Sequence, residues 1–122
     1  MDVRIHEVIA LLELNLQQVY KSKDIAHAVH LSAPRLRSLF RAETGQPLAR
    51  YQKSLRLQKA RMLLDKTNLN VKQIMFNVGI SDESHFVKDF KKAYGLPPTK
   101  YRTRCRRERE SGDVFQQNEQ AG

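Results

Sequence analysis

The 122-residue sequence has a single cysteine, Cys105, so the chain can form no internal disulfide and lacks the thiolates of a cysteine-rich zinc site. It contains no run of about 18 apolar residues, which a membrane-spanning helix requires. Its start, Met1–Arg4, does not have the basic-then-apolar layout of a signal peptide. We therefore expect no membrane partner and a location in the reducing cytoplasm.

Groups that carry enzyme chemistry are also scarce. The sequence has neither a glycine-rich phosphate loop nor a recognisable Ser/His/Asp arrangement. Its four histidines are scattered, and His27 and His30, which share a helix face or its end, have no third metal ligand beside them. The sequence therefore predicts no enzyme activity, no cofactor, no metal site and no small-molecule site.

Acidic residues are few relative to basic ones. Lys and Arg number 22 against 13 Asp and Glu, which gives a net charge of +9 and a pI near 10.0. Residues 1–103 hold 18 basic and 9 acidic residues, whereas 104–122 hold 4 of each, so the excess charge lies outside the C-terminal segment. Nucleic acid is the commonest partner of such a surface, and a merely soluble basic protein is the alternative.

Nearly every segment has helical spacing of apolar residues, and no period-2 run of strand length occurs, so we predict an all-α fold of about seven helices. Ser32 and Ser81 are predicted N-caps, and Asn70 with Gln73 has the spacing of a capping box. Residues 1–110 are expected to form the domain and 111–122 a disordered tail. The first four expected helices cover about residues 3–15, 22–29, 32–45 and 47–66. A fifth is expected from Asn70, a sixth after Gly79, and a short last helix from Pro98.

The chain also repeats itself. Ile25, Val29, Leu31 and Ser32 match residues 49 positions later, which are Ile74, Val78, Ile80 and Ser81. After one inserted residue the offset becomes 50, and a second set matches: Leu36, Phe40, Gly45, Pro47 and Tyr51 fall on Phe86, Phe90, Gly95, Pro97 and Tyr101. This pattern predicts two helix-turn-helix units, at about 22–45 and 70–95, joined by a linker helix at about 47–66.

The second helix of each predicted unit carries a polar stripe between its core positions. In the first unit the stripe is Pro34, Arg37, Ser38 and Arg41, and in the second it is Ser84, Val87, Lys88 and Lys91. Arg37 has the donors to bind guanine, and Val87 can touch a thymine methyl group. Cations near helix C-terminal ends suit phosphates, and the predicted phosphate-binding set is Ser32, Arg41, Ser81, His85, Lys91 and Lys92. A solvated polar face is the alternative.

The length of the predicted linker helix gives the separation of the two units. Its 18 residues from Pro47 to Leu64 span roughly 27 Å, so the two reading helices can sit about one DNA turn apart, roughly 34 Å. One chain would then read two adjacent major grooves of an asymmetric site. The linker is itself basic, and Arg56 and Arg61 can either approach DNA or pair with Asp65 or other acids.

Three blocks of the sequence, DIA…LS…LRSLFRAETGQPLARY, RLQKARMLL and VKQIMFNVGISDESHFVKDFKKAYGLPPTKYR, resemble the DNA-binding region of the AraC/XylS family of bacterial transcription regulators. The resemblance covers about residues 22–102. It implies two helix-turn-helix units on a linker helix, double-stranded DNA as partner, and RNA polymerase as a further candidate partner. It places base-facing positions on Pro34, Arg37, Ser38, Glu83, Ser84, Val87 and Lys88.

The sequence departs from the family pattern at a few positions. Lys21 is a poor N-cap, Met75 replaces the usual alanine, and Phe76 replaces a polar residue. Pro34 offers no hydrogen-bond donor for reading bases. Asp82 and Glu83 are predicted in the first turn after the Ser81 cap, where acids suit the helix dipole, and Glu83 can also accept from cytosine.

The sequence thus predicts a sequence-specific DNA-binding transcription regulator that acts at the nucleoid. Two alternatives remain open at this stage. One is an architectural protein that binds DNA without regard to sequence, although such proteins often insert an apolar wedge that this chain lacks. The other is a helical module whose basic faces bind an acidic protein.

Overall fold

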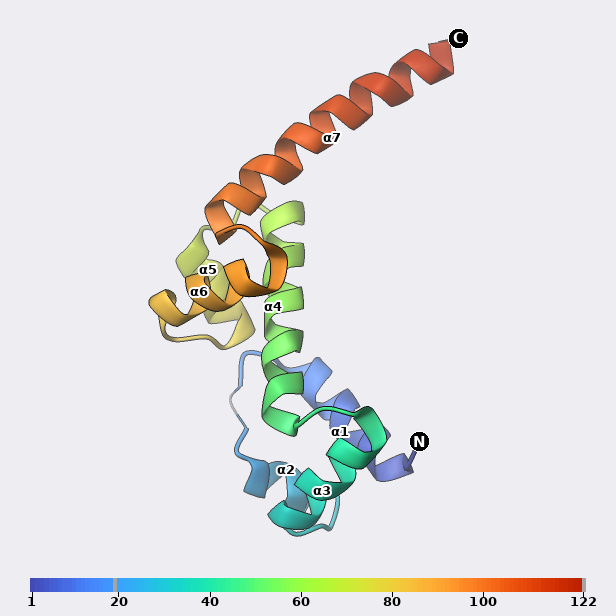
Figure 1. Cartoon of the computed structure of the whole chain (residues 1–122), viewed down its shortest axis with the longest axis vertical. Helices are drawn as coiled ribbons and strands as arrows, with labels where there is room; N and C mark the ends of the chain where they lie inside the picture. The colour runs from blue at the N-terminus through green and yellow to red at the C-terminus, as the bar shows by residue number, and fades with distance from the viewer. Residues whose placement is uncertain (19, 122) are drawn as a thin grey trace.

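The structure, a computed structural model, describes the backbone of residues 1–18 and 20–121 and the side chains of 1–18 and 20–111. Within these residues it has seven helices and no strand, which confirms the predicted all-α fold (Figure 1). No helix among them has both the length and the apolar character needed to cross a bilayer. The helices are α1 Val3–Leu14, α2 Ser22–Ala28, α3 Ala33–Thr44, α4 Leu48–Lys66, α5 Val71–Val78, α6 Glu83–Tyr94 and α7 Pro98–Ala121.

Most helix ends follow the local signals in the sequence. The Ser32 hydroxyl accepts from the Arg35 backbone N–H at 3.2 Å and begins α3, as predicted. Asn70 and Gln73 form the predicted capping box, with two hydrogen bonds of 2.8 Å. Lys21 precedes α2 without a side-chain capping bond. Pro47 was expected inside the first turn of the linker helix but is its N-cap.

The predicted cap of the sixth helix is wrong by one residue. The Asp82 carboxylate, not the Ser81 hydroxyl, accepts from the His85 backbone N–H at 3.0 Å, and α6 begins at Glu83. Aspartate and serine are about equally good N-caps, so side-chain type did not distinguish them. Asp82 is therefore the counterpart of Ser32, 50 positions on, and Ser81 belongs to a turn that is one residue longer. Glu83 lies in the first turn, as expected.

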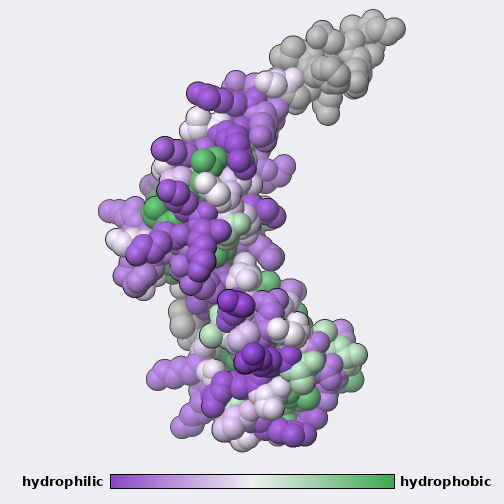
Figure 2. Space-filling view, viewed as in Figure 1, coloured by the Kyte–Doolittle hydropathy of each residue, from purple (hydrophilic) through white to green (hydrophobic). Residues whose placement is uncertain are grey.

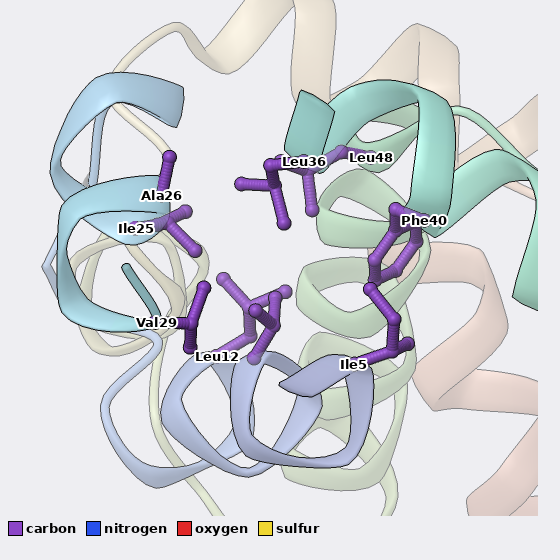
Figure 3. Packing of buried hydrophobic residues seen from close by; sticks show 9 residues of the cluster. Ile5, Leu12, Ile25, Ala26, Val29, Leu36, Phe40 and Leu48 are labelled. Carbon is purple, nitrogen blue, oxygen red and sulfur yellow. The ribbon is translucent and has the colours of Figure 1, made fainter. Parts of the chain in front are cut away.

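The helices form two separate cores, and α4 contributes to both. The first core joins α1, α2, α3 and the start of α4, and its side chains point toward one another in Figure 3. The second joins the rest of α4 to α5 and α6. The two units consequently lie on opposite halves of α4 (Figure 1). The α4 residues buried in the second core are Leu57, Ala60, Leu63 and Leu64.

The two units share the same aromatic contact, which confirms the duplication. Phe40 meets Tyr51 with ring centroids 5.2 Å apart and planes at 74°. Phe90 meets Tyr101 at 5.4 Å and 79°. In each unit the first ring comes from the second helix of the motif and the second ring from the following helix. The edge-to-face pair therefore fixes the same helix crossing twice.

The start of α7 packs against the C-terminal end of α4. The Arg102 guanidinium donates to the carbonyl oxygens of Leu64 at 3.0 Å, Thr67 at 3.2 Å and Leu63 at 3.5 Å. Arg109 donates to the carbonyl and the carboxylate of Asp65. Among the described residues, neither Arg56 nor Arg61 forms an ion pair with Asp65 or with another acid, so the expected pairing is wrong.

Helix α7 begins at Pro98, where the last helix was predicted to start, but the prediction of a short helix is wrong, since the backbone is helical to Ala121. The disordered tail predicted for residues 111–122 falls almost wholly outside the fully described part of the chain, and it stays a prediction.

Candidate nucleic-acid interface

Both units turn between their two helices in the same way. His30 has φ of 59° and Gly79 has φ of 75°, so each turn contains one residue in the left-handed region. The next residue then donates back to the first helix. Leu31 N–H reaches the Ala26 carbonyl at 2.8 Å, and Ile80 N–H reaches that of Met75 at 2.9 Å. The two turns therefore begin alike, although the second has one more residue before its helix, and each leads into the second helix of a helix-turn-helix.

The predicted base-reading residues of the second unit lie together. They line a shallow depression on the surface of α6, which we call the α6 groove. Phe86 and Phe90 on the opposite side of the helix anchor it to the core. Val87 is half-buried, whereas the charged members are exposed. The residues of the α6 groove are Glu83, Ser84, Val87, Lys88 and Lys91.

The corresponding stripe on α3 is exposed along its length. Pro34, Arg37, Ser38 and Arg41 all face solvent, while Leu36 is fully buried on the other side of the helix. Among the described residues, the side chains of Arg37, Ser38 and Arg41 make no hydrogen bond or ion pair. Their donors are thus available to an external ligand.

The predicted phosphate-binding residues of the second unit divide between two sides of α6. Lys91 lines the α6 groove, whereas Ser81 and His85 line a cleft between α4 and α6. Lys92 lies on the α4 side, in a hollow that it shares with Arg50 and Lys53. In the first unit, Ser32 is exposed at the start of α3. The groove and the cleft both include residues from the N-terminal end of α6.

The cleft between α4 and α6 contains several charges. Lys53 pairs with Asp89 at 3.0 Å, and His85 Nδ1 lies 3.2 Å from Asp82. The Asp82 carboxylate accepts from the His85 backbone N–H, which lowers its pKa below 3.8. Arg56 also lines this cleft, and its Nε is buried without a partner among the described residues. Burial lowers the pKa of the Arg56 guanidinium below its usual range.

Sequence reasoning missed one cation of the first unit. Arg35 is exposed on the first turn of α3, three residues after the Ser32 cap. Because α3 and α6 begin 50 positions apart, Arg35 is the counterpart of His85. The repeat therefore contained the signal that identifies Arg35, because His85 was already in the predicted phosphate-binding set.

The surface around these residues is polar. Figure 2 shows mainly hydrophilic residues over the visible face of the second unit, with small hydrophobic areas between them. Phe76 is an exception, since 71% of it is exposed, and nothing among the described residues explains its aromatic side chain. No group of three or more His, Cys, Asp or Glu side chains in the described part of the chain could hold a metal ion.

Comparison with known proteins gives consistent matches. Residues 25–104 match the profile of a family described as a helix-turn-helix domain. The arabinose operon regulatory protein of Escherichia coli K12 is 30% identical over 106 residues, which are 86% of this chain and 36% of that protein. The chain spans about a third of the length of the curated relatives that it matches.

Solved structures agree with the fold. A transcriptional regulator from Chromobacterium violaceum, described as having an AraC-type DNA-binding domain, superposes with a TM-score of 0.78 at 29% identity, over 84% of this chain and 91% of that one. The DNA-binding domain of AdpA, solved with a target DNA, has a TM-score of 0.83 at 22% identity, over 87% and 96%. At that identity the second likeness supports the fold alone.

Proposed function

Because the chain belongs to the AraC/XylS family of helix-turn-helix transcription regulators, we propose that it controls transcription by binding a specific double-stranded DNA sequence. The observation that carries the proposal is the α6 groove. It places a carboxylate, a hydroxyl, a methyl-bearing side chain and two ammonium groups on one exposed face of the second helix of the motif. That helix is the one which enters the major groove in such motifs.

The chemistry of the α6 groove suits base edges. Lys88 can donate to the guanine acceptors, Glu83 can accept from cytosine N4, and Val87 can contact a thymine methyl group. Ser84 can donate or accept. Because Glu83 also repels a misplaced phosphate, it favours correctly docked DNA over other approaches.

The first unit is expected to read fewer bases. Arg37 is its strongest reader, since a guanidinium can bind guanine through two hydrogen bonds. Ser38 can donate or accept, but Pro34 has no donor and contributes only its shape. We therefore assign most of the discrimination to the second unit and part of the anchoring to Arg35 and Arg41.

Phosphate contacts follow from the cations around the two stripes. We assign this role to Arg41, Lys91 and Lys92, with the polar groups of Ser32, Ser81 and His85 near the helix starts. Such contacts release counterions, so affinity should fall with salt. The net charge of +9 has the same consequence for non-specific binding.

The length of α4 allows both units to act on one duplex. Its 19 residues span roughly 28 Å, and the packing of each unit adds to the separation. Two adjacent major grooves on one side of the DNA are about 34 Å apart. The stripes differ in composition, so the bound site should be asymmetric. Action at a promoter would bring the bound protein near RNA polymerase, our proposed second partner, and would place it in the nucleoid.

Selection from randomised duplexes, followed by sequencing, tests the proposal. We expect an enriched asymmetric motif, and we expect Arg37→Ala and Lys88→Ala each to flatten preference at one position by roughly 1–3 kcal/mol. Arg41→Ala and Lys91→Ala should weaken binding to all sequences and reduce the salt slope by about 1 each. The control is Arg107→Ala, which removes one exposed cation of α7.

Two results would point elsewhere. Tight binding without any enriched motif would favour an architectural protein. A folded chain that binds no duplex at low salt would favour a module for an acidic protein partner. In both cases the base-reading assignment would be wrong.

A further inference from the structure

The connection between α1 and α2 reaches the second unit and lies against its turn. A Cβ atom added to Gly79 would be 2.4 Å from the Leu16 carbonyl oxygen and 3.2 Å from that of Gln17. Real Cβ atoms essentially never approach so closely, so the contact is between two backbones. Gln17 also lines a crevice together with Met75, Phe76 and Ile80. The first unit therefore contacts the second at a place far from α4 in the sequence.

The turn conformation alone does not require glycine at this position. His30 occupies the same place in the first unit with φ of 59°, and it carries a full side chain. Gly45 and Gly95 also have positive φ, yet a Cβ atom on either would meet nothing within 4 Å. Gly79 is distinguished by its close approach to the α1–α2 connection. The absence of a side chain here allows the two units to touch.

This contact changes how the units are joined. Helix α4 links them through the chain, and one helix leaves the second unit able to bend and twist relative to the first. The contact of Gly79 with Leu16 and Gln17 attaches the units at a second point. Two attachments that are not collinear restrict both movements. The separation and relative orientation of α3 and α6 then depend on α4 and on the contact at Gly79 together.

We propose that Gly79 and the backbone of Leu16 and Gln17 form a second joint, which fixes the spacing between the two DNA half-sites that the protein accepts. The inference rests on the proposed function, since half-site spacing matters only when both units bind one duplex. Gly79 is a positioning residue in this proposal, and the bases are still read by α3 and α6.

A library of duplexes tests the joint. Each duplex carries the two selected half-sites, and the distance between them varies in steps of one base pair. For Gly79→Ala we expect the preference for the best spacing over its neighbours to fall by at least about fivefold, the lower end of typical coupling between sites. Gly45→Ala and Gly95→Ala are matched controls, because they impose the same backbone strain without the contact. We expect each control variant to lose the same factor of DNA affinity at every half-site spacing.

A second variant leaves Gly79 intact. Two glycines inserted between Gln17 and Gln18 lengthen the connection, which surface loops tolerate at little cost. This insertion should also broaden the spacing preference. Circular dichroism of each variant establishes that its helices are retained, and the insertion decides the matter if Gly79→Ala does not fold.

The outcomes separate the joint from the proposed function. Uniform weakening by Gly79→Ala, or an unchanged spacing preference after the insertion, overturns the joint while the parent still selects its motif. If the parent itself shows no sequence and no spacing preference, both the proposed function and the joint are wrong.

Discussion

Arg102 links α7 to the C-terminal end of α4, and its replacement by alanine should destabilise the second unit. The last carbonyl groups of a helix have no partner within the helix. The Arg102 guanidinium binds one of them, on Leu64, and it also binds the carbonyl of Thr67 just beyond the helix end. Its longest contact is to the Leu63 carbonyl, which already accepts from the backbone N–H and the hydroxyl of Thr67. Its positive charge is favourable there because the C-terminus is the negative end of the helix dipole.

The size of the effect follows from these contacts. Two of the three hydrogen bonds, at 3.0 and 3.2 Å, have good lengths, and the third, at 3.5 Å, is at the limit. A hydrogen bond to a charged group contributes about 1.5–3 kcal/mol, and water will replace part of it at this half-buried site. We therefore expect Arg102→Ala to lower the free energy of unfolding by about 2 kcal/mol. Arg102→Lys should lose less, since it keeps the charge but not the fork of donors.

Urea unfolding followed by circular dichroism measures this loss. With a slope of about 2 kcal/mol per molar urea for a chain of this size, the midpoint should fall by roughly 1 M. The control is Arg107→Ala on the same helix, which removes an equal charge from an exposed position. Hydrogen exchange should show lost protection around Ile74 and Phe90 and unchanged protection around Val8. Equal midpoints for Arg102→Ala and Arg107→Ala would refute the capping role.

Two further predictions concern stability. Asp82 has a lowered pKa, so its contribution as N-cap is present above about pH 3.8 and lost as the pH falls through the lowered value. Asp82→Asn keeps a cap without the titration, and thermal melts of parent and variant should converge or cross on acidification; parallel curves would contradict this. Phe40→Ala and Phe90→Ala should each cost about 3–5 kcal/mol, because each ring is fully buried. Amide exchange should localise each loss to its own unit, and equal loss of protection in both would show that the two cores do not unfold separately.

The fold could be predicted largely because its signals are local and occur twice. Ser32, Asn70 and Gly45 mark helix ends through their own backbone or capping preferences. The repeat gave independent support, since Phe40 and Phe90 had to occupy equivalent positions. The α6 groove followed from the same pattern, because residues three and four apart on a helix share a face.

Features that depend on distant contacts were not predictable. Asp65 pairs with Arg109, which lies 44 positions away, and nothing in the sequence favoured it over the nearer Arg61. The contact of Gly79 with Leu16 involves backbone atoms only, so no side chain signals it. The choice between Ser81 and Asp82 as cap depended on the length of the turn. Chemically equivalent caps cannot reveal that length.

Helix α4 determines the rotation of one unit relative to the other as well as the distance between them. Successive residues of an α-helix are about 100° apart, so one residue added between the two cores would swing one unit about a quarter of a turn while moving it only about 1.5 Å. Seven residues would nearly restore the direction, with a residual rotation of about 20° and a displacement of about 10 Å. Point substitutions on α3 or α6 can therefore change what is read in small steps. A change in the length of α4 that keeps the relative orientation of α3 and α6 can alter the distance between them only in steps of about two helical turns.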